Sequence, residues 1–155
     1  MTTTYPDFGS VSSGTMRTED LLPAFLDAAK DYAQTPDEKR IVARLRTEWN
    51  ALDMDDADDT DTADEILSEI TDLLEGLAPP YGYFGSLEGD GADYGFWPSL
   101  DSVEDACRDG SALKVSDLAD VPDDYVGDVF QVSDHGNLTF YAADHGTYTE
   151  VWGIV

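Results

Sequence analysis

The sequence predicts an α+β fold in which an N-terminal lobe of three helices packs on a small, mostly antiparallel sheet that carries one short helix. Apolar residues recur at three- and four-residue spacing through residues 18–78, as on the buried face of a helix. After the proline pair at 79–80 they alternate with polar residues, as in a strand with one buried face. Helices followed by strands within one chain are typical of an α+β fold.

The first two helices are expected on either side of a short turn. Residues 19–33 are expected to form the first helix, with Thr18 as its N-cap and an apolar stripe at helical spacing. The second helix has a stronger start signal. Thr35 can cap it, a proline follows at the first helical position, and Glu38 completes a Thr-x-x-Glu capping box.

An acidic connector, residues 53–61, is expected between the second and third helices. It has no periodic apolar face, so the pattern predicts a solvated loop. Thr62 and Glu65 repeat the capping-box spacing, and the third helix is therefore expected to open at Thr62 and to stop near Gly76. Charge reversal within the connector should then leave the fold intact, because the segment has no apolar face to lose.

The second lobe is expected to begin with two aromatic strands, YGYFGSLE and DYGFWP, around a glycine-rich turn. Most of their rings are expected to belong to the core. Asp101 with Glu104 predicts the cap of a short helix that ends at Gly110. The segments VFQVSD, LTFYAA and TYTEVWGIV indicate three further strands joined by two tight turns, which is a β-meander.

Length and composition fit a single domain with two lobes, since 41% of the residues are hydrophobic. The expected division is a loose N-terminus over residues 1–17, a helical lobe over 18–78, and a sheet lobe over 79–155 that ends in the meander. Neither half of about 75 residues buries a large core alone, so the lobes are expected to unfold as one cooperative unit.

Charge is the strongest functional signal in the chain. Thirty-four acidic residues stand against eight Lys and Arg residues, which gives a formal net charge of -26. Such a charge opposes direct binding to nucleic acid or anionic membranes and favours a basic protein partner. Double-stranded DNA carries one charge per roughly 1.7 Å of axis, so this net charge matches that of about 13 base pairs. The sequence therefore predicts a partner that normally holds DNA or RNA.

The residues that could support catalysis or metal binding lack the required spacing. The chain contains no phosphate-binding, dinucleotide-binding, nucleophile-elbow or zinc-protease motif. Cys107 fits a buried helix residue. His135 and His145 each lie in an Asp-His-Gly turn, at opposite ends of one meander strand, so they cannot share a metal. We expect no enzymatic activity, no cofactor and no metal site.

The expected location is the cytoplasm. The opening residues contain no apolar run of the kind found in a signal peptide, and no segment reaches the ~18 residues of a membrane span. The single cysteine excludes an internal disulfide.

Two groups of carboxylates form the candidate partner-binding surface. The first lies in the connector and the start of the third helix, where eight carboxylates fall within thirteen residues. The second lies in the sheet lobe and has no nearby base. Packing so many like charges together costs self-repulsion, which favours a functional acidic surface over a merely solvated one. The members are Asp53, Asp55, Asp56, Asp58, Asp59, Asp61, Asp64 and Glu65, followed by Asp120, Asp123, Asp124 and Asp128.

In size, charge and lack of a catalytic motif, the chain resembles the DNA-mimic proteins of phages and mobile elements, which include anti-CRISPR and antirestriction inhibitors. This resemblance implies a non-enzymatic inhibitor that occupies the basic groove of a CRISPR effector or restriction enzyme, in the cytoplasm of the host cell. Two alternatives remain. A halophile's protein carries excess acid simply to stay hydrated in salt, and an immunity or antitoxin module uses it to bind a basic toxin.

Overall fold

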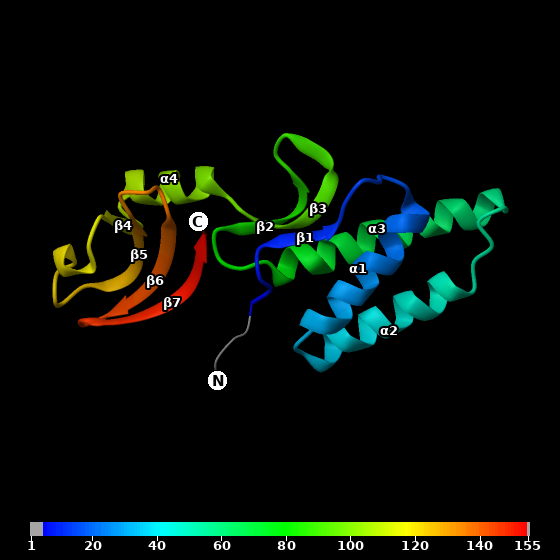
Figure 1. Ribbon diagram of the computed structural model, residues 1–155. Coiled ribbons are helices and arrows are strands. Elements are labelled where there is room, and N and C mark those ends of the chain that lie inside the picture. Colours follow the sequence, from blue (N-terminus) through cyan, green and yellow to red (C-terminus); the bar gives the residue numbers. More distant parts are fainter. Residues whose placement is uncertain (1–4, 155) are drawn as a thin grey trace. The chain divides into compact units, whose positions relative to one another are not determined.

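The computed structural model describes residues 5–154, which form an α+β structure with four α-helices and two sheets (Figure 1). The helices of the N-terminal part come first and most of the strands follow, which confirms the predicted fold class. The chain divides into two compact units, the first ending at Pro98 and the second beginning at Ser99. No helix among the described residues is long and apolar enough to span a membrane.

The first unit combines three helices with a three-stranded antiparallel sheet in the order β1-β3-β2. Its sheet lies beside α1 and α3 (Figure 1). The elements are β1 (Gly9–Ser12), α1 (Thr18–Tyr32), α2 (Pro36–Asn50), α3 (Ala57–Leu77), β2 (Gly82–Leu87) and β3 (Asp90–Pro98).

Aromatic side chains of β2 and β3 belong to the same core as the helices. Phe25 of α1 is buried, and its ring lies edge-on to that of Phe84 with 5.0 Å between the centroids. Phe96 lies 5.1 Å from Phe84, also buried. The lobes were expected to divide between residues 78 and 79, but these rings join the aromatic hairpin to the helices. The division in the structure therefore falls at Pro98.

The N-caps of the first two helices match the predicted ones only in part. The capping box of α2 is confirmed, because Thr35 Oγ1 accepts from the Glu38 amide at 3.1 Å and Glu38 Oε1 accepts from the Thr35 amide at 2.8 Å. The expected Thr18 cap of α1 is wrong. Arg17 occupies the N-cap position without a side-chain cap, and the Thr18 hydroxyl donates instead to Asp64 Oδ1 at 2.7 Å.

A short strand lies within the segment that was expected to be loose. Strand β1 pairs antiparallel with β3, with Ser10 opposite Gly95. At Gly95 an added Cβ would lie 2.1 Å from the carbonyl oxygen of Gly9. The two backbones can therefore approach this closely only because residue 95 has no side chain.

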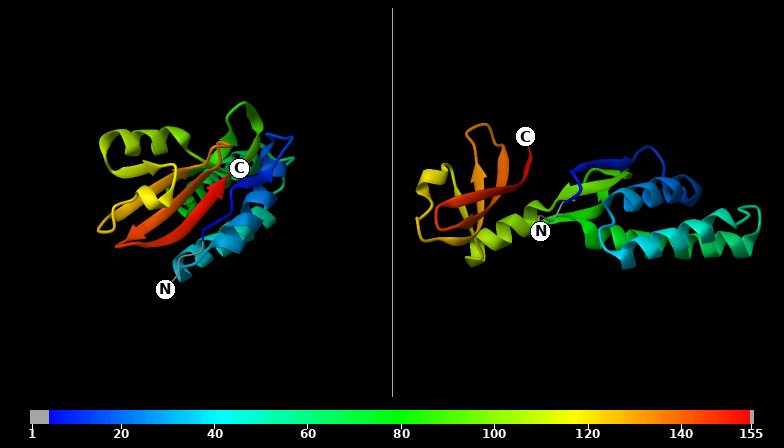
Figure 2. Two further views of the ribbon diagram at one scale, coloured as in Figure 1. Left: turned by 60° about the vertical axis from the view of Figure 1, so that its left-hand side comes forward. Right: turned by 90° about the horizontal axis from the view of Figure 1, so that it is seen from below.

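The second unit places α4 along one face of a four-stranded sheet in the order β4-β5-β6-β7 (Figure 2). The last three strands form the predicted meander. Strand β4 pairs parallel with β5 and was not predicted. The elements are α4 (Leu100–Asp109), β4 (Ala112–Val115), a 3-10 turn (Leu118–Asp120), β5 (Val126–Val132), β6 (Leu138–Asp144) and β7 (Thr147–Ile154).

Helix α4 ends where the sequence predicted, but a different residue caps its start. Ser99 is the N-cap, with its Oγ accepting from the Ser102 amide at 3.4 Å, so the expected Asp101 cap is wrong. At the other end Gly110 has a φ of 86°, which closes the helix in the left-handed conformation that favours glycine.

Each face of this sheet has its own apolar cluster. On one face the rings of Phe130, Phe140 and Trp152 pack together, with 5.0 Å between the first two centroids. On the other face Val129 and Ala143 pack with Val121 from the preceding loop.

Candidate acidic interface

The acidic connector is shorter than predicted, because α3 begins at Ala57 and not at Thr62. Asp56 is the N-cap, and its Oδ1 accepts from the Asp58 amide at 2.8 Å and from the Asp59 amide at 3.4 Å. Thr62 lies inside the helix, where its hydroxyl donates to the Asp58 carbonyl at 3.1 Å. Carboxylates in the first turn are favourable because they face the positive end of the helix dipole. The run of aspartates therefore starts a helix here.

Four of the eight predicted carboxylates in this region hold local structure. Asp53 Oδ1 accepts from the Asp55 amide at 3.0 Å, and Asp59 Oδ2 accepts from the Asp53 amide at 2.9 Å. Asp56 caps α3, and Asp64 accepts from α1. Reversing the charge at Asp56 or Asp59 would therefore disturb the helix start, contrary to the expectation that charge reversal in the connector leaves the fold intact.

The other four carboxylates are exposed, and within the described residues their side chains make no hydrogen bond or ion pair. They lie on or beside α3, and apart from the favourable place of Asp58 in the first turn they hold no local structure, so these side chains are free to meet a partner. We call them the open carboxylates: Asp55, Asp58, Asp61 and Glu65.

The charge spacing along α3 can be compared with that of nucleic acid. The helix holds eight carboxylates in 21 residues. At 1.5 Å per residue these extend over about 31 Å, or one carboxylate per roughly 4 Å. One DNA strand carries a charge every 3.4 Å or so along the axis. The total number of carboxylates per length of α3 is thus close to that of a single strand, but Glu69 pairs with Arg44, Glu75 accepts from the Phe84 amide, and the charge open to a partner is about half of that total.

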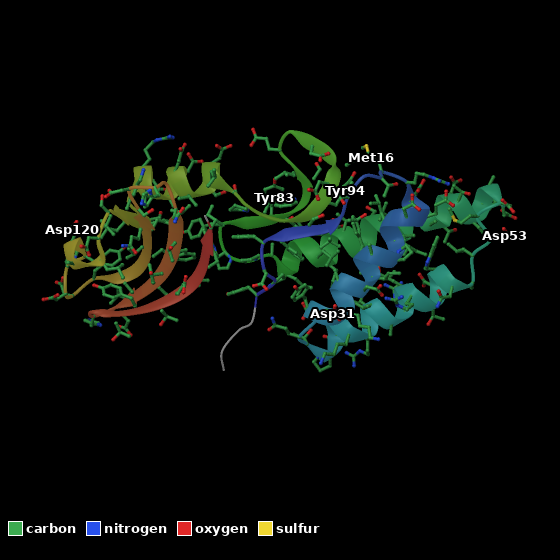
Figure 3. The ribbon with its side chains drawn as sticks, viewed as in Figure 1. Met16, Asp31, Asp53, Tyr83, Tyr94 and Asp120 are labelled. Carbon is green, nitrogen blue, oxygen red and sulfur yellow. The ribbon has the colours of Figure 1, made fainter. Side chains whose placement is uncertain are left out.

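The basic residues of the first unit are concentrated on α2. Four of its six Lys and Arg residues lie on this helix, and none lies between Arg46 and Arg108 in the sequence. Arg44 pairs with Glu69 and with Glu48, and these hydrogen bonds raise the pKa of its guanidinium. In Figure 3, Asp53 marks the acidic turn before α3, whereas Asp31 lies at the opposite end of α2.

A basic pocket on this helix was missed by the sequence analysis. It has a volume of about 580 Å³ and lies between the end of α1 and α2. Three bases line it and no carboxylate does: Lys30, Lys39 and Arg46. The spacing of Lys39 and Arg46 on α2 could be recognised from the sequence. The position of Lys30, which lies on α1, depends on how the two helices pack. Four of the six bases of the first unit nevertheless pair with carboxylates, among them Arg46 with Asp27 at 2.6 Å, so the charge of α2 is largely offset by its neighbours.

The second predicted cluster belongs to the second unit and forms a separate surface. Asp120, Asp123 and Asp124 are exposed in the loop before β5. Asp128 is half-buried within β5, beside Ala112 of β4. The outward-facing part of this cluster is therefore the loop, and Asp128 is its least accessible member.

The two histidines lie where the sequence placed them, in hairpin turns at opposite ends of β6. His145 has a φ of 48° and its Nδ1 lies 2.6 Å from Asp144 Oδ1. Among residues 5–154 no three His, Cys, Asp or Glu side chains are grouped so as to hold a metal ion. Burial raises the pKa of the half-buried Cys107 thiol, which makes it a weaker nucleophile at neutral pH.

Comparison with protein-family models, with curated proteins and with solved structures found no match to this chain.

Proposed function

We propose that this protein is a non-enzymatic inhibitor that mimics the charge of nucleic acid and occupies the basic groove of a nucleic-acid-binding defence complex, such as a CRISPR effector or restriction enzyme. The observation that carries the proposal is the start of α3. There Asp58, Asp61 and Glu65 are exposed on the helix and Asp55 is exposed in the turn before it, and none of these side chains makes a hydrogen bond or ion pair among the described residues. The protein would then act in the cytoplasm, where such complexes bind DNA or RNA.

Physical chemistry favours a rigid acidic helix for this role. Carboxylates on a helix require little loss of backbone freedom on binding, because the helix is already formed. Long-range attraction between opposite charges raises the association rate and makes it fall as salt shortens the Debye length, about 8 Å in physiological buffer. The loop with Asp120, Asp123 and Asp124 offers a second contact of the same kind.

Salt adaptation is one alternative cause of the acidity. A protein of that kind carries excess acid to stay hydrated in salt and needs no basic partner. The halophile alternative predicts that the fold is lost at low salt. Far-UV circular dichroism and urea unfolding with and without molar KCl test it, and an intact fold at low salt would reject it.

The open carboxylates do not by themselves distinguish a nucleic-acid-binding target from a small basic toxin. Both partners would contact exposed carboxylates. The immunity or antitoxin alternative predicts that the protein binds one small basic protein and does not compete with DNA or RNA. Competition with nucleic acid therefore separates the two functions.

A charge-neutral variant of the open carboxylates tests the interface directly. The triple variant Asp55→Asn, Asp58→Asn and Asp61→Asn removes three carboxylates whose side chains make no hydrogen bond or ion pair among the described residues, and urea unfolding shows whether the fold survives the loss of the first-turn charge of Asp58. An exposed ion pair is worth roughly 0.2–1 kcal/mol, so the loss of three should weaken binding about threefold to a hundredfold. Surface plasmon resonance against purified defence complexes measures this, with most of the change expected in the association rate.

The matched control removes the same charge elsewhere in the first unit. Asp7, Asp31 and Glu88 are also exposed, and within the described chain their side chains make no hydrogen bond or ion pair. The variant Asp7→Asn, Asp31→Asn and Glu88→Gln should bind nearly as well as the native protein. Equal weakening by both triple variants would show that only net charge matters and would reject the α3 interface.

A further inference from the structure

The second unit contains a pocket between α4 and the sheet that the acidic interface does not use. Helix α4 lies along the face of the sheet that carries Phe130 (Figures 1 and 2). The pocket has a volume of about 420 Å³, within the range of roughly 300–1,000 Å³ typical of small-molecule sites. Its apolar lining comes from the helix and from three strands: Leu100, Val103, Phe130, Val132, Leu138 and Ile154.

The space beneath α4 has a specific origin in β4. The parallel register places Ala112 beside Asp128 and Lys114 beside Phe130, so Ala112 and Lys114 are the β4 residues on the face that α4 covers. One is small and the other is charged, so β4 provides no large apolar side chain to fill this space. Leu100, at the start of α4, remains 53% exposed.

The charges around the pocket are unusual for this unit. From Ser99 onward the chain has twelve acidic residues and only two Lys or Arg residues, Arg108 and Lys114. Both of them line this pocket. Lys114 makes no ion pair with any described residue, whereas Arg108 lies 3.2 Å from Asp105. Among the described residues Glu104 is the one carboxylate of the lining, and because Asp105 offsets the charge of Arg108, Lys114 is the base of the lining whose charge is not paired.

We propose that this pocket binds a small amphipathic carboxylate, with its aliphatic chain in the apolar space beneath α4 and its carboxylate at Lys114 and Arg108. An apolar cavity with a few cations at one side is complementary to a ligand with one charged end. A large anion such as a nucleic acid would be repelled by the whole chain at -26. A small one responds mainly to charges within the Debye length. This inference is independent of the proposed inhibitor function.

Cys107 provides the readout, because it lines the same pocket and is the only cysteine in the chain. Alkylation of the intact protein by N-ethylmaleimide is measured in the presence of hexanoate, octanoate or decanoate. A bound ligand should cover the thiol and slow alkylation at least tenfold at saturation. Affinity should rise about fourfold for each added methylene as long as the chain is buried. Octylammonium, which has the opposite charge, should protect far less than octanoate.

Two variants, one that removes a positive charge and one that removes a negative charge, test the electrostatics of the pocket. Lys114→Gln should weaken octanoate binding and Glu104→Gln should strengthen it, each by about two- to fivefold, the range for one exposed charge pair. Both residues are exposed, so neither change should unfold the protein. The matched control is Lys39→Gln, which alters the net charge in the same direction as Lys114→Gln but lies in the first unit.

Three outcomes would overturn the proposal. The first is that decanoate below its micellar concentration leaves the alkylation rate of Cys107 unchanged. The second is that octylammonium protects the thiol as well as octanoate does, because the pocket would then have no preference for an anion. The third is that Lys39→Gln weakens octanoate binding as much as Lys114→Gln, because only the net charge of the chain would then matter.

Discussion

The carboxylate of Asp56 holds the first turn of α3, so its removal should destabilise the protein while the loss of a neighbouring carboxylate should not. Asp56 Oδ1 accepts from two backbone amides, at 2.8 and 3.4 Å. Loss of an N-cap of this type costs about 0.5–2 kcal/mol, and loss of a carboxylate near a helix N-terminus costs about 0.3–1 kcal/mol. We therefore expect Asp56→Ala to lower the free energy of unfolding by about 1–2 kcal/mol.

Urea and thermal unfolding measure this change. For a chain of this length 1 kcal/mol corresponds to a fall in Tm of about 2–4 °C. Asp55→Ala is the matched control, because it removes the same charge one residue earlier from a side chain that makes no hydrogen bond among residues 5–154. Asp56→Asn should recover most of the loss, since asparagine also caps helices well. If Asp56→Ala proved no more destabilising than Asp55→Ala, the assignment of Asp56 as the cap would be refuted.

Three further predictions follow from the fold. Hydrogen bonds from the Thr35 and Gln34 amides hold the pKa of Glu38 below its ordinary value of 4.5. The ionised Glu38 therefore adds to the free energy of unfolding above pH 4.5, and this stabilisation is lost as pH falls through the lower pKa of the folded state. In the variant Glu38→Gln, the free energy of unfolding should fall less between about pH 6 and pH 3 than in the native protein, as measured by urea unfolding. Gly95→Ala should cost about 1–3 kcal/mol, because its Cβ meets the Gly9 carbonyl oxygen, whereas Gly91→Ala, where the space is open, should cost much less. A fragment that ends at residue 78 should fail to give a cooperative unfolding transition because it lacks the core rings of Phe84 and Phe96, and calorimetry of the whole chain tests the expectation of a single transition.

Local signals in the sequence were the ones that predicted structure well. The capping box of Thr35 and Glu38 lies within four residues and needs no distant partner, so it could be recognised directly. The meander strands are joined by tight turns and were equally clear. Strands β1 and β4 were missed because each has four residues and pairs with a distant segment. The Ser10 hydroxyl of β1, for example, donates a hydrogen bond to Asp93, which lies 83 residues further along the chain.

The candidate site could be located from the sequence but its structure could not. The aspartate run was recognisable as a dense group of carboxylates. Its interpretation as a loop failed because the first turn of α3 needs no apolar face when Asp56 satisfies its amides. The sequence also gave no means of separating the structural carboxylates from the open ones. That separation depends on which side chain meets which amide, as Asp59 meets that of Asp53.

Competition with nucleic acid for a defence complex is the most direct test of the proposed function. Labelled DNA is bound to a purified CRISPR effector or restriction enzyme, and fluorescence anisotropy follows its release as the protein is added. We expect the native protein to displace the DNA, less effectively as salt rises. The variant that lacks Asp55, Asp58 and Asp61 should need about threefold to a hundredfold more protein. DNA that stays fully bound to every complex at saturating native protein would contradict nucleic-acid mimicry.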